Sequence, residues 1–233
     1  MRLRLLSYNV HKCVGLDRRR KPGRIVEVIN QTGADIIALQ EVDLRLGRRP
    51  AALPLSLVEQ HTDYHVPDFA PDSPSLGWHG QAILLRRGIE VRGIERITLP
   101  GLEPRGALLA EGSCGGVAFR VIGAHLGLIR RYRLMQMAAI RAAIGARAGM
   151  PTAILGDFNE WSSRNGMAPL TDAFHVHAPG RSFPAARPIA GLDRIALSPG
   201  WHLRDAGVHK TTLARIASDH LPVWADVRLS ADG

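Results

Sequence analysis

The stretch ILGDFNEWSS, residues 154–163, contains the clearest structural signal in the chain. An apolar run ends abruptly at Gly156, and Asp157, Asn159 and Glu160 follow within four residues. A buried strand that opens at its end into carboxylate and carboxamide groups is a common way for an α/β protein to build a site on a rigid scaffold. Gly, Asp, Asn and Ser are also ordinary turn residues, so these ten residues alone favour a strand followed by a simple turn.

The length and composition predict one globular domain that spans residues 1–233. The chain has 233 residues, of which 45% are hydrophobic and 22% charged, as in ordinary soluble proteins. No apolar run is long enough to cross a bilayer, and the N-terminal segment reaches Ser7 and Asn9 too early for a signal peptide. We therefore expect a cytoplasmic protein, with a monomer favoured.

The charge balance favours partners that are polyanions. Lys and Arg number 30 against 21 Asp and Glu, which gives a formal net charge of +9. Such a surplus suits nucleic acid, anionic lipid headgroups or phosphate esters. Arginine dominates the basic residues, and a GC-rich genome would produce the same bias.

Hydrophobic periodicity predicts alternating strands and helices. Strand-like apolar patterns cover residues 3–10, 35–42, 81–86, 89–99, 106–111, 117–126, 152–155, 192–197, 201–208 and 221–229. Helical patterns cover residues 22–32, 50–61, 131–148 and 166–174. The strands between residues 81 and 126 are typical of a meander of hairpins, and residues 67–77, rich in Pro, Asp and Ser, predict a loop.

Polar residues that can bind a metal or move a proton stand at six strand ends. They are Asn9, Glu41, His125, the pair Asp157 and Asn159, Asp193, and the pair Asp219 and His220. Each alone has an ordinary structural explanation, such as an Asx turn or a hydrogen-bonded core histidine. Together they indicate an active site, because ligands of α/β proteins bind where strand ends meet at the mouth of a sheet.

The residue types at these strand ends suit hard metal ions and phosphate. Carboxylate and carboxamide oxygens are ligands for Mg²⁺ or Mn²⁺. Two cysteines, Cys13 and Cys114, are too few for a zinc cluster, and the chain has no H-E-x-x-H motif. A phosphate-binding G-x-x-x-x-G-K-[ST] loop and a G-x-S-x-G nucleophile elbow are also missing. Metal-assisted attack of water on phosphorus is the chemistry that remains.

Seven short motifs follow one another along the chain. They are YNVHK at residues 8–12, LQEV at 39–42, HGQAIL at 79–84, AHL at 124–126, GDFNE at 156–160, LDRI at 192–195 and SDHLPV at 218–223. In this order they resemble the endonuclease/exonuclease/phosphatase superfamily, over residues 7–223. The resemblance implies a DNase I-like four-layer α/β sandwich, two packed β-sheets flanked by helices, and a phosphoesterase that uses Mg²⁺ or Mn²⁺.

The resemblance also implies roles for the acidic and amide residues. Glu41 is similar to the principal metal ligand of the family, with Asn9 beside it, and Asp219 is similar to a residue that completes the metal shell or a second, weaker site. Asp157 would orient the attacking water. Asn159 would hold a nonbridging phosphate oxygen.

Basic residues near the phosphate are implied in the same way. His220, steered by Asp193, resembles the family's histidine near the scissile phosphate. His125 resembles the partner histidine of the DNase and sphingomyelinase branches, and Arg105 resembles an arginine that contacts substrate. Independently of the resemblance, two arginine clusters follow these motifs closely enough to border the site, Arg45, Arg48 and Arg49 in one, Arg130, Arg131 and Arg133 in the other; solvated surface is the alternative and the commoner outcome for such runs.

The substrate class stays open at this stage. A phosphodiester in DNA or RNA is favoured, because of the charge. The alternatives are a phospholipid or sphingolipid headgroup, a small phosphoester hydrolysed by a phosphatase, and a noncatalytic binding protein. The lipid alternative needs an exposed apolar loop, for which residues 67–78 with Phe69, Leu76 and Trp78 are the candidate. No tyrosine-bearing segment typical of abasic-site endonucleases accompanies His125, and the chain differs from secreted DNases.

Overall fold

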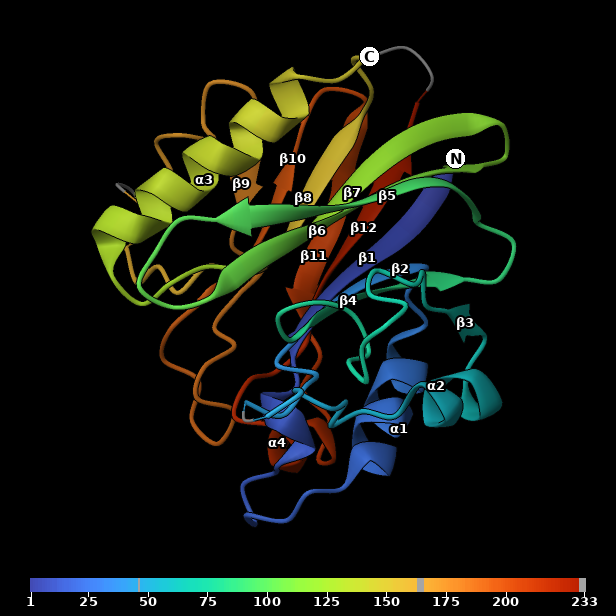
Figure 1. The fold of residues 1–233 in the computed structure, drawn as a ribbon, viewed down its shortest axis with the longest axis vertical. Helices are drawn as coiled ribbons and strands as arrows, with labels where there is room; N and C mark the ends of the chain where they lie inside the picture. Colours follow the sequence, from blue (N-terminus) through green and yellow to red (C-terminus); the bar gives the residue numbers. More distant parts are fainter. Residues whose placement is uncertain (46, 163–165, 231–233) are drawn as a thin grey trace.

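Two six-stranded β-sheets form the framework of the protein in the computed structural model, which describes residues 1–45, 47–162 and 166–230 (Figure 1). The first sheet has the strand order β11 (Trp201–Val208), β12 (Val223–Leu229), β1 (Arg2–Asn9), β2 (Ile36–Gln40), β4 (Gln81–Arg86), β3 (Tyr64–His65). The second has the order β5 (Glu90–Leu99), β6 (Arg105–Cys114), β7 (Val117–His125), β8 (Thr152–Asp157), β10 (Asp193–Leu197), β9 (His175–His177).

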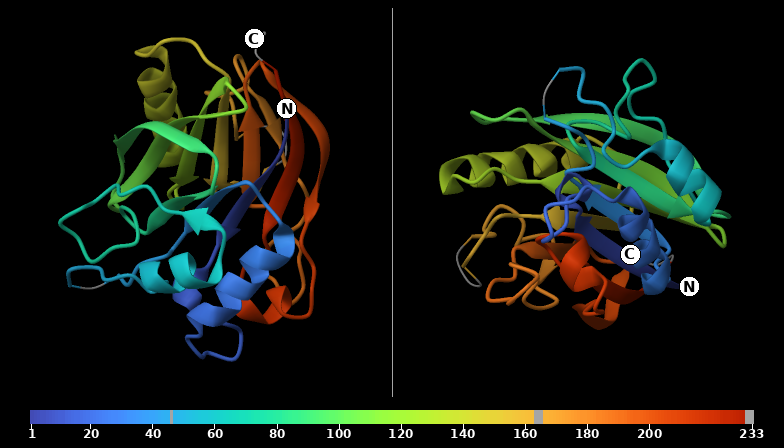
Figure 2. Two further views of the ribbon diagram at one scale, coloured as in Figure 1. Left: turned by 90° about the vertical axis from the view of Figure 1, so that its right-hand side faces the viewer. Right: turned by 90° about the horizontal axis from the view of Figure 1, so that it is seen from below.

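Helices cover the outer faces of both sheets. They are α1 (Pro22–Thr32), α2 (Leu55–His61), α3 (Arg130–Gly145) and the short α4 (Ala214–Ala217), with a 3₁₀ turn, η1 (His11–Cys13), after β1. Figures 1 and 2 show α1, α2 and α4 gathered on one side of the molecule and α3 on the other. No described helix is long and apolar enough to cross a membrane.

Alternation along the strands produces three apolar layers, because successive side chains of a strand point to opposite faces. In β1, Leu6 and Tyr8 pack toward α1, whereas Leu3 and Leu5 pack between the two sheets. The outer face of the second sheet packs against α3, as the contact of Ile122 with the α3 core cluster illustrates. The expected α/β sandwich of two packed sheets flanked by helices is therefore confirmed.

The strand register brings polar strand ends to one edge of the sandwich. Strands β7 and β8 run parallel with His125 opposite Asp157, and β10 runs antiparallel to β8 with Asp193 opposite Asp157. In the other sheet, β1 and β2 run parallel and end together at Asn9 and Gln40. Residues far apart in the sequence therefore meet at this edge.

Gly156 explains why the apolar run of β8 ends in glycine. A Cβ placed on Gly156 would lie 1.9 Å from the carbonyl oxygen of Ala124 on β7. Only a residue without a side chain permits this approach of the two backbones, which sets Asp157 directly beside His125.

Most predicted strands and the helices at residues 22–32 and 131–148 are observed, but three details of the prediction are wrong. The strands from residue 81 onward do not form one meander, since β4 pairs with β2 and β3 in the first sheet. The helix predicted at 50–61 begins only at Leu55, because Pro54 occupies its N-cap. Residues 166–174 form turns around Pro169 rather than a helix.

Candidate active site

One oxygen of Asp157 is the point at which three predicted site residues meet. Asp157 Oδ2 accepts a hydrogen bond from Asn9 Nδ2 at 3.1 Å. The same oxygen lies 3.5 Å from His125 Nε2 and 3.6 Å from His220 Nε2. These residues come from β1, β7 and the segment before β12, so both sheets contribute to a single cluster that surrounds a buried carboxylate.

The other Asp157 oxygen holds the loop that follows β8. Asp157 Oδ1 accepts the backbone N–H of Asn159 at 2.9 Å, and Asn159 adopts a left-handed backbone conformation with φ of 50°. Its side-chain nitrogen donates to the carbonyl oxygen of Leu126 at 2.8 Å. Since a carboxamide nitrogen carries two hydrogens, one remains for a ligand oxygen.

His220 is held in its charged form by surrounding carboxylates. Its Nδ1 lies 3.0 Å from Asp193 Oδ2, which also accepts the hydroxyl of Ser182. Burial alone would lower the pKa of His220, but Asp193 above all, then Asp157 and Asp219, raise it to about 10. The side chain is therefore an imidazolium at neutral pH.

His125 has the opposite charge state although it touches the same Asp157 oxygen. Burial lowers the pKa of His125 to about 4, and the nearby positive charge of Arg105 acts in the same direction, whereas Asp157 acts against it. His125 is therefore a neutral imidazole at neutral pH. At neutral pH the carboxylate of Asp157 is thus in contact with a positively charged ring, His220, and with an uncharged ring, His125.

Glu41 is a fixed negative charge at the end of β2. Burial works to raise the pKa of Glu41, but three cations outweigh it and lower the pKa to about 2: His125, which is protonated in the acid range where Glu41 titrates, Lys12 and Arg45. Its carboxylate forms an ion pair with Lys12 of η1, and Arg45 lies 3.7 Å from it. The residue itself adopts a left-handed conformation with φ of 56°.

Asn9 and Asp219 adjoin each other through Ser218. The Ser218 hydroxyl donates to the backbone carbonyl of Asn9 at 2.7 Å and lies 3.3 Å from Asp219 Oδ1. Asn9 Oδ1 accepts the backbone N–H of His11 at 3.0 Å. Both predicted metal ligands therefore sit at the mouth of the first sheet, where each presents a side-chain oxygen.

The donor chemistry of this region fits a hard divalent cation. Glu41 is ionised, and the further donors, Asn9 and Asp219, supply oxygen. Within the described ranges no three His, Cys, Asp or Glu side chains converge as a metal site, and the cation in direct contact with Glu41 is the Lys12 ammonium, with the Arg45 guanidinium 3.7 Å away. A metal held by Glu41 would share or replace that ion pair.

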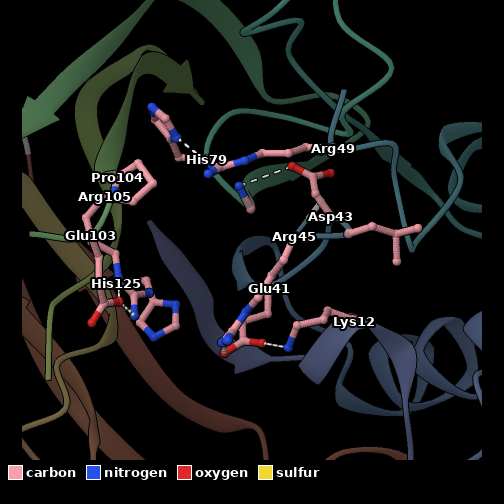
Figure 3. Close-up of a pocket in the computed structure, with 12 residues that line it drawn as sticks. Lys12, Glu41, Asp43, Arg45, Arg49, His79, Glu103, Pro104, Arg105 and His125 are labelled. Carbon is pink, nitrogen blue, oxygen red and sulfur yellow. Dashed lines mark hydrogen bonds and ion pairs between the residues drawn. The ribbon is translucent and has the colours of Figure 1, made fainter. Parts of the chain in front are cut away.

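A pocket of about 300 Å³ opens beside the cluster (Figure 3). Glu41, Lys12 and His125 lie in its wall, together with Arg105, whose guanidinium contacts Glu103 at 2.6 Å. Figure 3 shows Arg49 and His79 across the pocket from His125. The predicted substrate contact Arg105 therefore shares a cavity with the predicted metal ligand Glu41.

Sequence reasoning assigned no role to Lys12, Arg49's partner His79, Ser182 or Ser218. Lys12 and His79 were within reach, because the motifs YNVHK and HGQAIL contain them. Ser218 was within reach too, as the first residue of the motif SDHLPV, whereas Ser182 lies outside the seven motifs and acts through Asp193, eleven positions away.

The basic cluster after His125 does not act as one unit. Arg133 is buried and pairs with Glu160 at 2.9 Å, so its charge is neutralised inside the protein. Gln136 joins two loops, because its side chain accepts the Gly127 N–H and donates to the Pro100 carbonyl. The expectation that Arg133 borders the site as a surface charge is wrong.

Comparisons with known proteins agree with this architecture. The sequence model of the Endonuclease/Exonuclease/phosphatase family matches residues 6–220. Uncharacterized protein YbhP of Escherichia coli K12 is 29% identical over 252 residues, which cover 97% of this chain and 96% of that protein.

Two solved structures show the same fold at low sequence identity. A mannosyl-6-phosphatase of Bacteroides thetaiotaomicron superposes with a TM-score of 0.76 at 18% identity and covers 97% of this chain and 100% of its own. TDP2 of D. rerio, complexed with a single-strand DNA product, superposes with a TM-score of 0.74 at 16% identity and covers 97% and 99%.

Proposed function

Since the chain belongs to the endonuclease/exonuclease/phosphatase family, we propose that it is a Mg²⁺- or Mn²⁺-dependent phosphodiesterase in which Asp157 directs a water molecule at phosphorus. The observation that carries the proposal is the convergence of Asn9, His125 and His220 on one oxygen of Asp157. A carboxylate that is held this firmly can orient a water molecule and accept its proton.

The residues around Asp157 would stabilise the charge on the phosphate or hold the reacting groups in place. The oxygen of water forms a bond to phosphorus while the bond to the leaving-group oxygen breaks. The His220 imidazolium and the remaining N–H of Asn159 stabilise the negative charge that grows on the nonbridging oxygens. Asp193 keeps His220 protonated, and Asn9 keeps Asp157 in place. A divalent cation held by Glu41, Asn9 and Asp219 would supply further positive charge to the phosphate.

A nucleic-acid strand is the substrate class that we favour. Lys12, Arg45, Arg49 and Arg105 line one pocket, and the chain has a formal net charge of +9. Such a basic surface suits a repeating phosphate backbone. The structural similarity to TDP2 bound to single-strand DNA supports this choice, while the similarity to a mannosyl-6-phosphatase keeps small phosphoesters as the alternative.

A lipid phosphodiester is a second candidate, for a different reason than the sequence suggested. The proposed apolar loop at 67–78 does not qualify, because Phe69 and Leu76 are only 4% and 6% exposed. Leu102, Leu128 and Ile129, by contrast, are 76%, 66% and 51% exposed, in loops that flank Arg105 and His125. Binding to vesicles of anionic phospholipid, and its loss on replacement of Leu102 and Leu128 by Ser, would favour this candidate.

Turnover of a generic diester tests the proposed activity. Bis(p-nitrophenyl) phosphate should be hydrolysed in the presence of Mg²⁺ or Mn²⁺, and Asp157→Asn should lower the rate by roughly 10² or more. Asp172→Asn is a matched control, because this carboxylate is 71% exposed and pairs only with Arg141 in the described structure. An unchanged rate in folded Asp157→Asn would refute the role, and no turnover of any diester would refute the activity.

A further inference from the structure

The pocket beside the catalytic cluster extends beyond the residues that the proposed reaction needs. Arg49 and His79 line it together with His125 and Arg105 (Figure 3). We propose that Arg49 and His79 form a subsite for a second phosphate group of the substrate, adjacent to the phosphate under attack. This inference rests on the proposed phosphodiesterase function and specifies its substrate.

The charge of Arg49 is offset only in part by the protein, through the buried carboxylate of Asp43, whose pKa Arg49 works to lower. Other cations of the pocket have carboxylate partners, since Lys12 pairs with Glu41 and Arg105 pairs with Glu103. Arg49 has no carboxylate within ion-pair distance in the described ranges, and its side chain instead contacts His79 Nδ1 at 3.0 Å. A half-buried guanidinium without an ion-pair partner is suited to an anionic ligand.

His79 contributes a hydrogen-bond donor rather than a second charge. Burial lowers the pKa of His79, and the charges of Arg49 and Arg96 act in the same direction, so its ring is neutral at neutral pH. Because Nδ1 accepts a hydrogen from Arg49, the ring proton resides on Nε2. The pair therefore presents guanidinium N–H groups and one imidazole N–H, the donors that phosphate oxygens require.

Asp43 joins the two loops that carry this pair. Its buried carboxylate accepts the hydroxyl of Ser75 and the backbone N–H groups of Leu76 at 3.0 Å and Gly80 at 3.1 Å. Strand-like pairing of Asp43 with Ala51 closes the loop that contains Arg49. The backbone of the two loops is thus held by buried contacts, and the Arg49 side chain is held by its contact with His79.

The backbone around the pair is held in a conformation that side chains seldom adopt. Arg49 and His79 have φ values of 52° and 51°, and Glu41 on the same pocket has 56°. Left-handed backbone at a residue other than glycine costs free energy, and such residues cluster where a ligand is bound. The His79 ring is also in contact with the ring of Trp78, which packs against it edge-on with 4.1 Å between the ring centroids.

The ligand chemistry follows from this geometry. A cavity of about 300 Å³ accommodates a phosphate together with part of the group to which it is esterified. The subsite recognises a second phosphate, either the next phosphodiester of a nucleic-acid strand or a terminal phosphate of a small molecule. A substrate with a single phosphate leaves Arg49 without an anion.

Two chromogenic substrates test the subsite directly. Thymidine 5′-(p-nitrophenyl phosphate) carries one phosphate, and the same compound with a 3′-phosphate carries two. For the wild-type enzyme we expect kcat/KM to be about tenfold or more higher for the second compound, the scale of one charge-assisted pair. In Arg49→Asn and His79→Asn this preference should fall toward one, because asparagine tolerates the left-handed backbone but its short, uncharged carboxamide supplies neither the guanidinium charge of Arg49 nor the reach of His79 Nε2.

The control is Arg18→Asn, which makes the same substitution at an exposed arginine whose φ is 59°. It should keep the wild-type preference, and thermal unfolding should show all variants folded. A third substrate, in which the 3′-phosphate continues into a second nucleotide, distinguishes the sources. An equal or greater preference for it indicates a strand, and its loss indicates a small bisphosphate.

Each result separates the subsite from the activity. No turnover of either compound contradicts the phosphodiesterase itself. Turnover of both compounds with equal kcat/KM in the wild type, or an unchanged preference in folded Arg49→Asn, overturns the subsite while the phosphodiesterase stands.

Discussion

Replacement of Asp193 by Asn should uncouple His220 from its positive charge. The substitution preserves size and removes one negative charge from a side chain that is 0% exposed. The pKa of His220 rises from 6.5 to about 10 in the folded protein, which corresponds to a preference of about 5 kcal/mol for the imidazolium, since one pKa unit is about 1.4 kcal/mol. Asp193 supplies the largest favourable share of it, against a burial cost that remains.

We therefore expect the pKa of His220 in Asp193→Asn to fall toward or below its ordinary value of 6.5. At pH 8 the ring would be neutral, and the rate of diester hydrolysis should fall roughly 10²-fold, the loss seen when one electrostatic donor is removed from an active site. Long-range ¹H–¹⁵N NMR of the imidazole rings, recorded from pH 5 to 10, measures the protonation state without reference to activity.

The positive charge of His220 also makes the free energy of unfolding depend on pH. Below pH 6.5 the folded and unfolded chains both hold the His220 proton, and between pH 6.5 and about 10 only the folded chain holds it. The contribution of His220 to the free energy of unfolding is thus complete below pH 6.5 and declines as pH rises, by at most about 1.4 kcal/mol per pH unit. Urea unfolding should show this decline in the wild type and not in Asp193→Asn. A neutral His220 in the wild type at pH 7.5 would refute the reasoning.

Further predictions concern metal binding, a buried ion pair and the stability of the protein at acid pH. Chelation should abolish activity, and Lys12→Met should tighten Mn²⁺ binding measured by calorimetry, because it removes the ammonium that competes for Glu41; unchanged affinity would contradict that competition. Arg133→Ala should lower the free energy of unfolding by about 3 kcal/mol or more in urea titrations, because it leaves Glu160 buried without its partner, whereas exposed Arg131→Ala should not. Since the folded pKa of His125 is about 4 and the unfolded value 6.5, only the unfolded chain binds this proton between those values, so stability should fall as pH drops from 6.5 to 4, and His125→Asn should reduce that slope.

Local patterns were sufficient to predict most of the strands and helices and to place polar residues at strand ends, whereas the layers of the fold were implied by the resemblance of the seven motifs to a known family. The apolar alternation from residue 3 onward indicated a strand, and the structure shows it buried on both faces, with Leu3 and Leu5 on one side and Leu6 and Tyr8 on the other. Asp157 could be placed at a strand end from Gly156 and the apolar residues before it. Such signals are readable because backbone geometry and neighbouring side chains act over a few residues.

Only the tertiary structure decided which strands share a sheet and why two residues of the same type have different charge states. Strand β4 is followed in the sequence by β5, but it pairs with β2 in the other sheet, and no local pattern indicates this pairing. His125 and His220 are the same residue type at similar strand ends, yet one is neutral and the other charged. Partners that lie 27 and 148 positions apart in the chain determine this chemistry, as Asp193 does for His220 and Asn9 for Asp157. Burial and charge act through space, so a residue's pKa and its ion pairs depend on neighbours that folding brings together.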